Sequence, residues 1–225
     1  MAWLTVPADT ATPELERVTE PWRRRGEQVP PVMAVLKRNS RAFEAVLGLN
    51  YALAFGASSL GRRREELIAT WVSALNDCFF CLATHARYLE VFWAGNAADY
   101  LALVRTLPTL AQRFHDDHAS AWDALALLPG LEKNEAELLR FVAQLSLAPE
   151  ASDQAGYERL RAADHSEAEV LDIVLIASCF AFMNRLACGT GVALDPSKHE
   201  AAVRLFGETA VAKHIAWAAR SAVSE

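Results

Sequence analysis

Two cysteines and a histidine lie close together in the sequence and could carry out redox chemistry. Cys78 and Cys81 are three residues apart, and His85 follows Cys81 by four residues. On one α-helix these spacings place all three side chains on the same face. Two thiols this close can form a disulfide after one of them is oxidised, so the pair supports a complete two-electron cycle.

The residues before the cysteines predict the start of a helix. Asn76 and Asp77 are good N-cap residues, and this placement would put both cysteines in the first helical turn. There the free backbone N–H groups and the helix macrodipole favour a thiolate over a thiol. By this argument alone Cys78, which is nearest the helix N-terminus, is the more acidic of the two thiols.

A row of polar residues runs along the segment before the cysteines. Glu66, Thr70, Ser73 and Asp77 recur at intervals of four, three and four, while apolar residues fill the other faces. Two interpretations remain open at this point. The row is either a solvent-facing stripe, or it points Glu66 at the cysteine face, where Glu66 exchanges protons with His85.

Zinc binding is the main chemical alternative to redox chemistry. Cys78, Cys81 and His85 could supply three zinc ligands, but a closed structural site needs a fourth. The sequence has no second CxxC or CxxH motif that could provide it. A structural role for the pair is the third possibility. We favour the redox interpretation and predict neither a metal nor a cofactor.

The elements that must position these residues are predicted to be helices. Turn signals are sparse, and apolar residues recur at intervals of three and four over long windows, which is the period of an α-helix. The fold class is therefore expected to be all-α. Helices are predicted over residues 40–56 (with Ser40 as N-cap), 61–77, 78–95, 98–128 (broken near Pro108), 133–147, 167–187 and 196–220.

Composition excludes several classes of protein. The 225 residues are 52% hydrophobic and 22% charged, which excludes disorder as the main state. With 22 basic and 28 acidic residues the net charge is −6, so we expect no nucleic-acid partner and no membrane partner. Four cysteines are too few for a disulfide scaffold. The expected location is the reducing cytoplasm.

The run from Ala54 through Glu66 to Cys78, Cys81 and His85 resembles the AhpD-like alkylhydroperoxidase group of the carboxymuconolactone decarboxylase family. The resemblance rests on a glutamate twelve residues before CxxC and a histidine seven residues after its first cysteine. Residues 169–174 and 182–187 are similar to the degenerate second half of the longer, peroxidase-related members. The resemblance covers most of residues 30–195.

This resemblance implies an AhpD-like helical fold and an alkylhydroperoxidase-like enzyme, a homo-oligomer that reduces organic hydroperoxides. By position, Cys81 would attack the peroxide and Cys78 would resolve the product as a disulfide. Glu66 and His85 would relay protons. The implied partners are a small-molecule hydroperoxide and an external dithiol reductant. The alternatives to a peroxidase are a non-enzymatic redox-sensing helical oligomer and a metal-binding CxxC/His module.

Two positions depart from the family pattern. Phe80 stands between the cysteines where relatives often have a tyrosine or histidine, so that residue offers no proton relay here. Cys188 stands where relatives more often carry an acid, and we expect it to have a packing role. Cys179 lies among apolar residues and is expected to be buried.

The predicted organisation has an N-terminal arm and two helical halves. The arm covers residues 1–30, the AhpD-like half with CxxC covers 31–128, and a degenerate second half over 129–225 packs on the first. Sliding the sequence by 103 residues places Cys78, Cys81 and His85 opposite Ala181, Asn184 and Cys188. If the halves are related, only the first kept its redox-capable residues.

Overall fold

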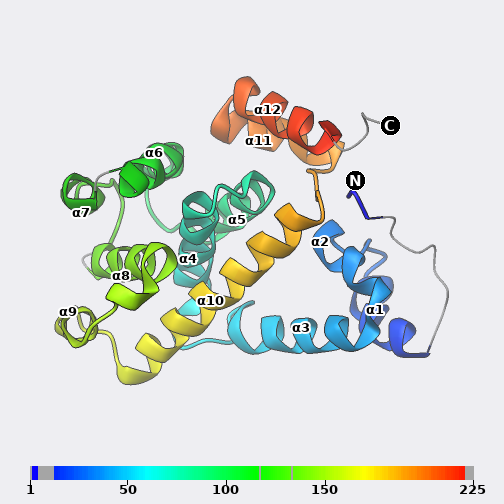
Figure 1. Cartoon of the computed structure of the whole chain (residues 1–225), viewed down its shortest axis with the longest axis horizontal. Coiled ribbons are helices and arrows are strands. Elements are labelled where there is room, and N and C mark those ends of the chain that lie inside the picture. Colours follow the sequence, from blue (N-terminus) through cyan, green and yellow to red (C-terminus); the bar gives the residue numbers. More distant parts are fainter. Residues whose placement is uncertain (1, 5–12, 117, 133, 221–225) are drawn as a thin grey trace.

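The computed structural model describes residues 2–4, 13–116, 118–132 and 134–220, and the regular secondary structure among them is helical, with no strand (Figure 1). This confirms the all-α prediction. The α-helices are α1 (Pro13–Arg24), α2 (Pro31–Ala34), α3 (Ser40–Leu53), α4 (Gly61–Leu75), α5 (Phe79–Phe92), α6 (Ala97–Asp116), α7 (His118–Ala126), α8 (Glu135–Leu147), α9 (Gln154–Ala162), α10 (Glu167–Gly189), α11 (His199–Phe206) and α12 (Glu208–Ala219). Short 3₁₀ turns cover Val35–Arg38, Pro149–Ala151 and Pro196–Lys198.

Helix α4 lies at the centre of the molecule. Every residue from Glu65 to Leu75 is buried, and α4 packs against α5, α6, α8 and α10. A helix buried on all sides has no solvent to satisfy its polar groups, so each polar side chain on α4 must find a partner inside the protein. This requirement shapes the candidate active site.

Helix α10 crosses the molecule diagonally beside α4 (Figure 1). Its start carries a capping box, in which Ser166 accepts from the backbone N–H of Glu169 and the Glu169 side chain accepts from that of Ser166. Among the described residues α10 alone is long and apolar enough to cross a membrane by length and composition, but half of its most apolar 18-residue window is buried in the fold, as for a core helix.

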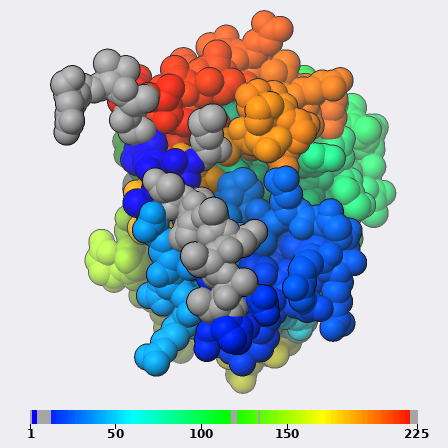
Figure 2. Space-filling view, turned by 90° about the vertical axis from the view of Figure 1, so that its right-hand side faces the viewer, coloured from blue at the N-terminus to red at the C-terminus, as the bar shows by residue number. Residues whose placement is uncertain are grey.

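The C-terminal helices α11 and α12 close over the end of α5 that carries CxxC. The Phe79 ring of α5 lies 5.6 Å from the Phe206 ring and 5.2 Å from the His214 ring, centre to centre. On the face in Figure 2 these orange and red helices lie next to the blue N-terminal region. There the Trp3 indole donates to the carbonyl of Ala218 at 3.0 Å.

Several helix boundaries differ from the prediction, and three of the differences have a clear local cause. Asn39, rather than Ser40, caps α3, because its side chain accepts from the backbone N–H of Ala42 at 3.1 Å. Pro108 lies inside α6 instead of breaking it, since buried residues on both sides of the proline hold the helix in the core. Gly207, with φ +83°, divides the last predicted helix into α11 and α12.

The predicted arm contains a helix where the structure describes it. In α1, Glu20 pairs with Arg23 and Arg24 on an exposed face, and Val18 is buried. Residues 1 and 5–12 of the arm lie outside the described residues, as do residues 133 and 221–225 of the second half. Helices α8 and α10 pack on α4. The division of the chain at residues 30 and 128 stays a prediction.

Candidate active site

The structure brings Glu66 and His85 into direct contact. Nδ1 of His85, on α5, lies 2.8 Å from Oε2 of Glu66, on α4. The Glu66 side chain is 5% exposed and that of His85 is 18% exposed. Because a carboxylate accepts hydrogen bonds, the contact holds the proton of a neutral His85 on Nδ1 and leaves Nε2 free to accept one.

The polar row on α4 is buried, so its interpretation as a solvent-facing stripe is wrong. Glu66, Thr70 and Ser73 are each at most 4% exposed. The Thr70 and Ser73 hydroxyls donate to carbonyls one turn earlier in α4, at 2.6 Å each. Asp77 is exposed and lies beyond the end of α4 with φ +51°.

Arg62 belongs to the site, although the sequence analysis missed it. Its guanidinium donates to Oε1 of Glu66 and to Oε2 of Glu65, and the carboxylate of Glu66 is thus held between Arg62 and His85. The guanidinium also lies over the rings of Phe55 and Phe92, at 5.4 and 4.8 Å from their centres. The sequence signal was available, because Arg62 precedes Glu66 by one helical turn.

Helix α5 begins one residue later than predicted, so both cysteines lie one position nearer its N-terminal end. Helix α5 begins at Phe79, and Cys78 itself is the N-cap residue, with Asp77 in the turn before it. Only Cys81 is therefore in the first turn, one turn before His85 on the same helix. Cys78 and Cys81 are 1% and 3% exposed, and the four cysteines of the chain are free thiols.

The surroundings of Cys78 oppose the acidity that a helix N-terminus would give it. Interaction with the Cys188 thiol acts to lower the pKa of Cys78. Interaction with the Cys81 thiol, burial, and the charge that Cys81 can carry outweigh that effect, and the pKa of Cys78 is raised well above its usual range. As the N-cap residue, Cys78 is also less well placed to benefit from the helix dipole than a residue within the first turn.

Helix α10 contributes a row of residues to the site that the sequence analysis did not recognise. Phe180, Asn184 and Cys188 are spaced four residues apart on α10. The Phe180 ring packs edge-on against the ring of His85, with centres 4.6 Å apart. Asn184 donates to Oγ of Ser73 at 3.1 Å. Its Oδ1 atom accepts from the side-chain amide of Asn76, also at 3.1 Å.

Cys188 completes this row next to Cys78. The thiols of Cys78 and Cys188 line the same cavity and influence each other's pKa. Interaction with the Cys78 thiol, together with burial, raises the pKa of Cys188. Cys188 is half-buried at the cavity, whereas Cys179 is buried as predicted, and burial raises the pKa of its thiol to about 11. The four-residue spacing of the α10 row was the available sequence signal.

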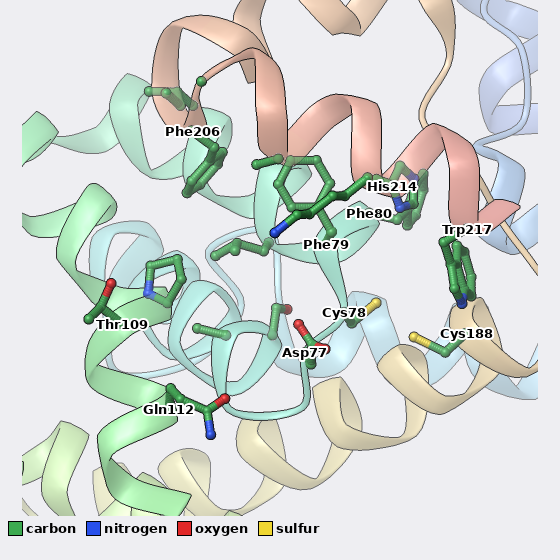
Figure 3. Close-up of a pocket in the computed structure, with 18 of the residues that line it drawn as sticks. Asp77, Cys78, Phe79, Phe80, Thr109, Gln112, Cys188, Phe206, His214 and Trp217 are labelled. Carbon is green, nitrogen blue, oxygen red and sulfur yellow. The ribbon is translucent and has the colours of Figure 1, made fainter.

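A cavity of about 920 Å³ opens beside Cys78 and Cys188 (Figure 3). Aromatic side chains from α5, α11 and α12 line one side of it: Phe79, Phe80, Phe206, His214 and Trp217. Cys81, His85 and Glu66 are not among the lining residues. The site therefore has two sides, with the Glu66–His85 pair on one and the Cys78–Cys188 pair on the other.

The geometry gives no support to the zinc alternative. Among the residues that the structure describes, no group of three or more His, Cys, Asp and Glu side chains is arranged to hold a metal ion. His85 instead directs Nδ1 at the carboxylate of Glu66, and the Cys78 thiol interacts with two other thiols. The arrangement is suited to proton transfer and thiol–disulfide exchange.

Comparison with known proteins supports the description of the fold. Residues 40–90, which span α3, α4 and most of α5, match the carboxymuconolactone decarboxylase family. No curated protein matches the sequence significantly. The chain resembles the AhpD core of an uncharacterized peroxidase-related protein from Ralstonia eutropha JMP134, with a TM-score of 0.68 and 19% identity over 88% of this chain and 94% of that one.

Two further crystal structures are similar. An uncharacterized peroxidase-related protein from Silicibacter sp. TM1040 has a TM-score of 0.66 and 23% identity over 88% of this chain and 94% of that one. The debrominase Bmp8, in complex with 2,3,4-tribromopyrrole, has a TM-score of 0.63 and 15% identity over 91% and 100%. The fold is therefore AhpD-like, and the resemblance to the carboxymuconolactone decarboxylase family and its peroxidase-related proteins is confirmed.

Proposed function

We propose that this protein is a thiol-dependent peroxidase that reduces organic hydroperoxides through the Cys78/Cys81 pair, with Glu66 and His85 as a proton relay. The observation that carries the proposal is the 2.8 Å contact between His85 and Glu66 one helical turn from Cys81. Cys78, three residues before Cys81 at the N-cap of the same helix, supplies a resolving thiol to the same site.

The reaction begins at Cys81. His85, through Nε2, takes the thiol proton, and the thiolate attacks the terminal oxygen of the hydroperoxide. The O–O bond breaks, and the alkoxide leaves with a proton from His85, so that Cys81 becomes a sulfenic acid. The Cys78 sulfur then attacks the Cys81 sulfur, water leaves, and a disulfide forms. An external dithiol returns two electrons and two protons to the pair.

Glu66 and Arg62 support this chemistry without touching the peroxide. Glu66 fixes the orientation and tautomer of His85 and stabilises the imidazolium that forms when His85 takes a proton. Arg62 holds the other oxygen of Glu66. The resulting chain from Arg62 through Glu66 to His85 is largely buried, and this protects its electrostatic interactions from screening.

A peroxidase assay tests the proposal directly. Purified protein would be given cumene hydroperoxide with dithiothreitol as the reductant, and peroxide loss would be followed for the wild type, Cys78→Ser, Cys81→Ser and the control Cys179→Ser. We expect the first two substitutions to abolish steady-state turnover, while the third preserves it. Full turnover by Cys81→Ser would overturn the assignment. Redox-dependent changes in assembly without any turnover would favour the redox-sensing alternative.

A reductive dehalogenase is the second candidate, and the aromatic cavity beside Cys78 favours it. A planar ring could lie against Phe79 or Trp217 within reach of the thiol pair. Two thiols and a bromoarene would give the debrominated ring, hydrogen bromide and one disulfide. The two electrons that the thiols lose reduce the carbon–bromine bond. Bromide release from 2,3,4-tribromopyrrole by the dithiothreitol-reduced protein separates this activity from peroxide reduction.

The proposed dithiol cycle also leads to a proposal for the cellular location of the protein. An external dithiol resets the pair, which suits a reducing cytoplasm.

We further propose a homo-oligomer, because large apolar side chains on α5 and α10 are exposed in the single chain: Tyr88, Val91, Phe92, Leu171, Leu175 and Phe182. Light scattering coupled to size-exclusion chromatography should give a mass at least twice the 24.7 kDa of one chain.

A further inference from the structure

The thiol side of the site contains three cysteines rather than two. Cys78, the N-cap residue of α5, interacts electrostatically both with Cys81 in the first turn of that helix and with Cys188 at the end of α10, and it lines the same cavity as Cys188. Figure 3 shows the sulfur atoms of Cys78 and Cys188 pointing toward each other at the cavity. A sulfur between two others can form a disulfide with either.

The three thiols differ in their access to the cavity. Cys78 and Cys188 line it, whereas Cys81 is 3% exposed and is not among the lining residues. Cys188 is the more exposed of the cavity pair, since it is half-buried while Cys78 is 1% exposed. A dithiol reductant in the cavity can therefore approach Cys188 more readily than any sulfur of a Cys78–Cys81 disulfide.

We propose that Cys188 is a third redox thiol, which moves the disulfide from Cys78–Cys81 to Cys78–Cys188 and so presents it to the reductant in the cavity. The inference rests on the proposed dithiol cycle, which supplies the first disulfide at the expense of an organic hydroperoxide. The reductant is then a small dithiol that enters the cavity.

The exchange step involves no net oxidation. Cys188 loses its proton to solvent in the cavity, and its thiolate attacks the Cys78 sulfur. The Cys78–Cys188 bond forms as the Cys78–Cys81 bond breaks, and the electron pair leaves with Cys81, which regains a proton from His85. Cys81 and His85 are thereby ready for another peroxide while the cavity disulfide awaits two electrons from the dithiol.

Peptide mapping after brief oxidation tests the inference. Wild type, Cys81→Ser, Cys188→Ser and the control Cys179→Ser would each be treated with one equivalent of diamide or of cumene hydroperoxide, blocked with N-ethylmaleimide and digested. We expect the wild type and Cys179→Ser to show Cys78–Cys81 first and Cys78–Cys188 later. Cys81→Ser should form Cys78–Cys188 with diamide. Cys188→Ser should stop at Cys78–Cys81, and its steady-state turnover with dithiothreitol should fall by about tenfold.

Failure of the Cys188 inference and failure of the proposed peroxidase function would give different results. Complete alkylation of Cys188 in every oxidised sample, alongside a normal Cys78–Cys81 disulfide, would overturn the inference and leave the peroxidase standing. Equal turnover of Cys188→Ser and Cys179→Ser would also overturn it. Absence of hydroperoxide consumption by the wild type would overturn the proposed function, and the diamide samples would then still report whether Cys78 exchanges between Cys81 and Cys188.

Discussion

Glu66 and His85 are 19 positions apart in the sequence, and their side chains meet at 2.8 Å between the central helix α4 and the CxxC helix α5. Both helices are needed to form this contact. Among the ion pairs of the described residues, Glu66 has one further partner, Arg62. The pair is the part of the site whose role can be tested most cleanly, because α4 offers a neighbouring glutamate as a control.

Glu66→Gln should lower hydroperoxide turnover by roughly 10²-fold, because glutamine cannot stabilise an imidazolium at His85. The matched control is Glu65→Gln. Glu65 is also buried, but it accepts from the backbone N–H groups of Gly56 and Ser58 and from the Ser58 hydroxyl, so it holds the loop before α4. Glu65→Gln should lower the melting temperature more than the rate. Equal losses of turnover in the two variants would refute the relay.

His214 should make the folded protein less stable in mild acid. Burial, with a contribution from His199, lowers the pKa of His214 from 6.5 to about 4, and its Nε2 atom accepts from the backbone N–H of Leu194 at 3.2 Å. Between these two pH values the unfolded chain binds a proton at this position that the folded chain does not. The free energy of unfolding should therefore fall as the pH drops from 6.5 toward 4.

Urea denaturation at several pH values measures this effect. His214→Gln removes the titration while its side-chain oxygen can still accept from Leu194. The difference in unfolding free energy between wild type and variant should shrink or change sign in favour of the variant as the pH falls through this window. Parallel pH profiles for the two proteins would contradict the assignment of the titration to His214.

Asn184→Ala should destabilise the protein by about 1–3 kcal/mol, because it removes one hydrogen-bond partner from the buried Ser73 hydroxyl and one from the partly buried Asn76 amide. Asn184 is 1% exposed and joins the Ser73 hydroxyl to the Asn76 amide. The neighbouring Arg185→Ala is the control, since Arg185 is exposed and donates to the carbonyl of Ala181 on its own helix. Chemical denaturation of both variants should show a clear loss only for Asn184→Ala.

Much of the fold could be predicted from local patterns. Apolar periodicity located α4, α8 and α10 to within two residues at most ends, since a long amphipathic or buried helix repeats its signal several times. Single-residue boundaries were less accurate. The cap of α3 moved by one residue to Asn39, and Pro108 was tolerated within α6, because tertiary packing outweighed a local preference.

The residues of the candidate site could also be predicted only in part from the sequence. Spacing left the role of Glu66 open and the family resemblance paired it with His85, and the structure brings the two side chains together. Arg62 was missed although it lies one turn from Glu66. The α10 residues Asn184 and Cys188 could not be placed, because their contacts with α4 and α5 depend on how helices more than 100 residues apart in sequence cross. Sequence periodicity describes one helix at a time and does not specify such a crossing.

Cys81, rather than Cys78, should carry the first sulfenic acid after peroxide treatment. Two observations support Cys81: it lies in the first turn of α5, one turn before His85, and the pKa of Cys78 is raised among its neighbouring thiols. One equivalent of cumene hydroperoxide should therefore give Cys78→Ser a sulfenic acid at Cys81, which dimedone traps and mass spectrometry locates.

The complementary variant must take Cys188 into account. In Cys81→Ser, a sulfenic acid at Cys78 would be consumed by the adjacent Cys188 thiol before dimedone could react with it. The double variant Cys81→Ser/Cys188→Ser removes this route, and we expect its Cys78 to be labelled at least tenfold more slowly than Cys81 in Cys78→Ser. Comparable labelling of Cys78 in the double variant would transfer the peroxide-attacking role to Cys78. In that case the thiol interactions that raise its pKa would have to be relieved when the peroxide binds.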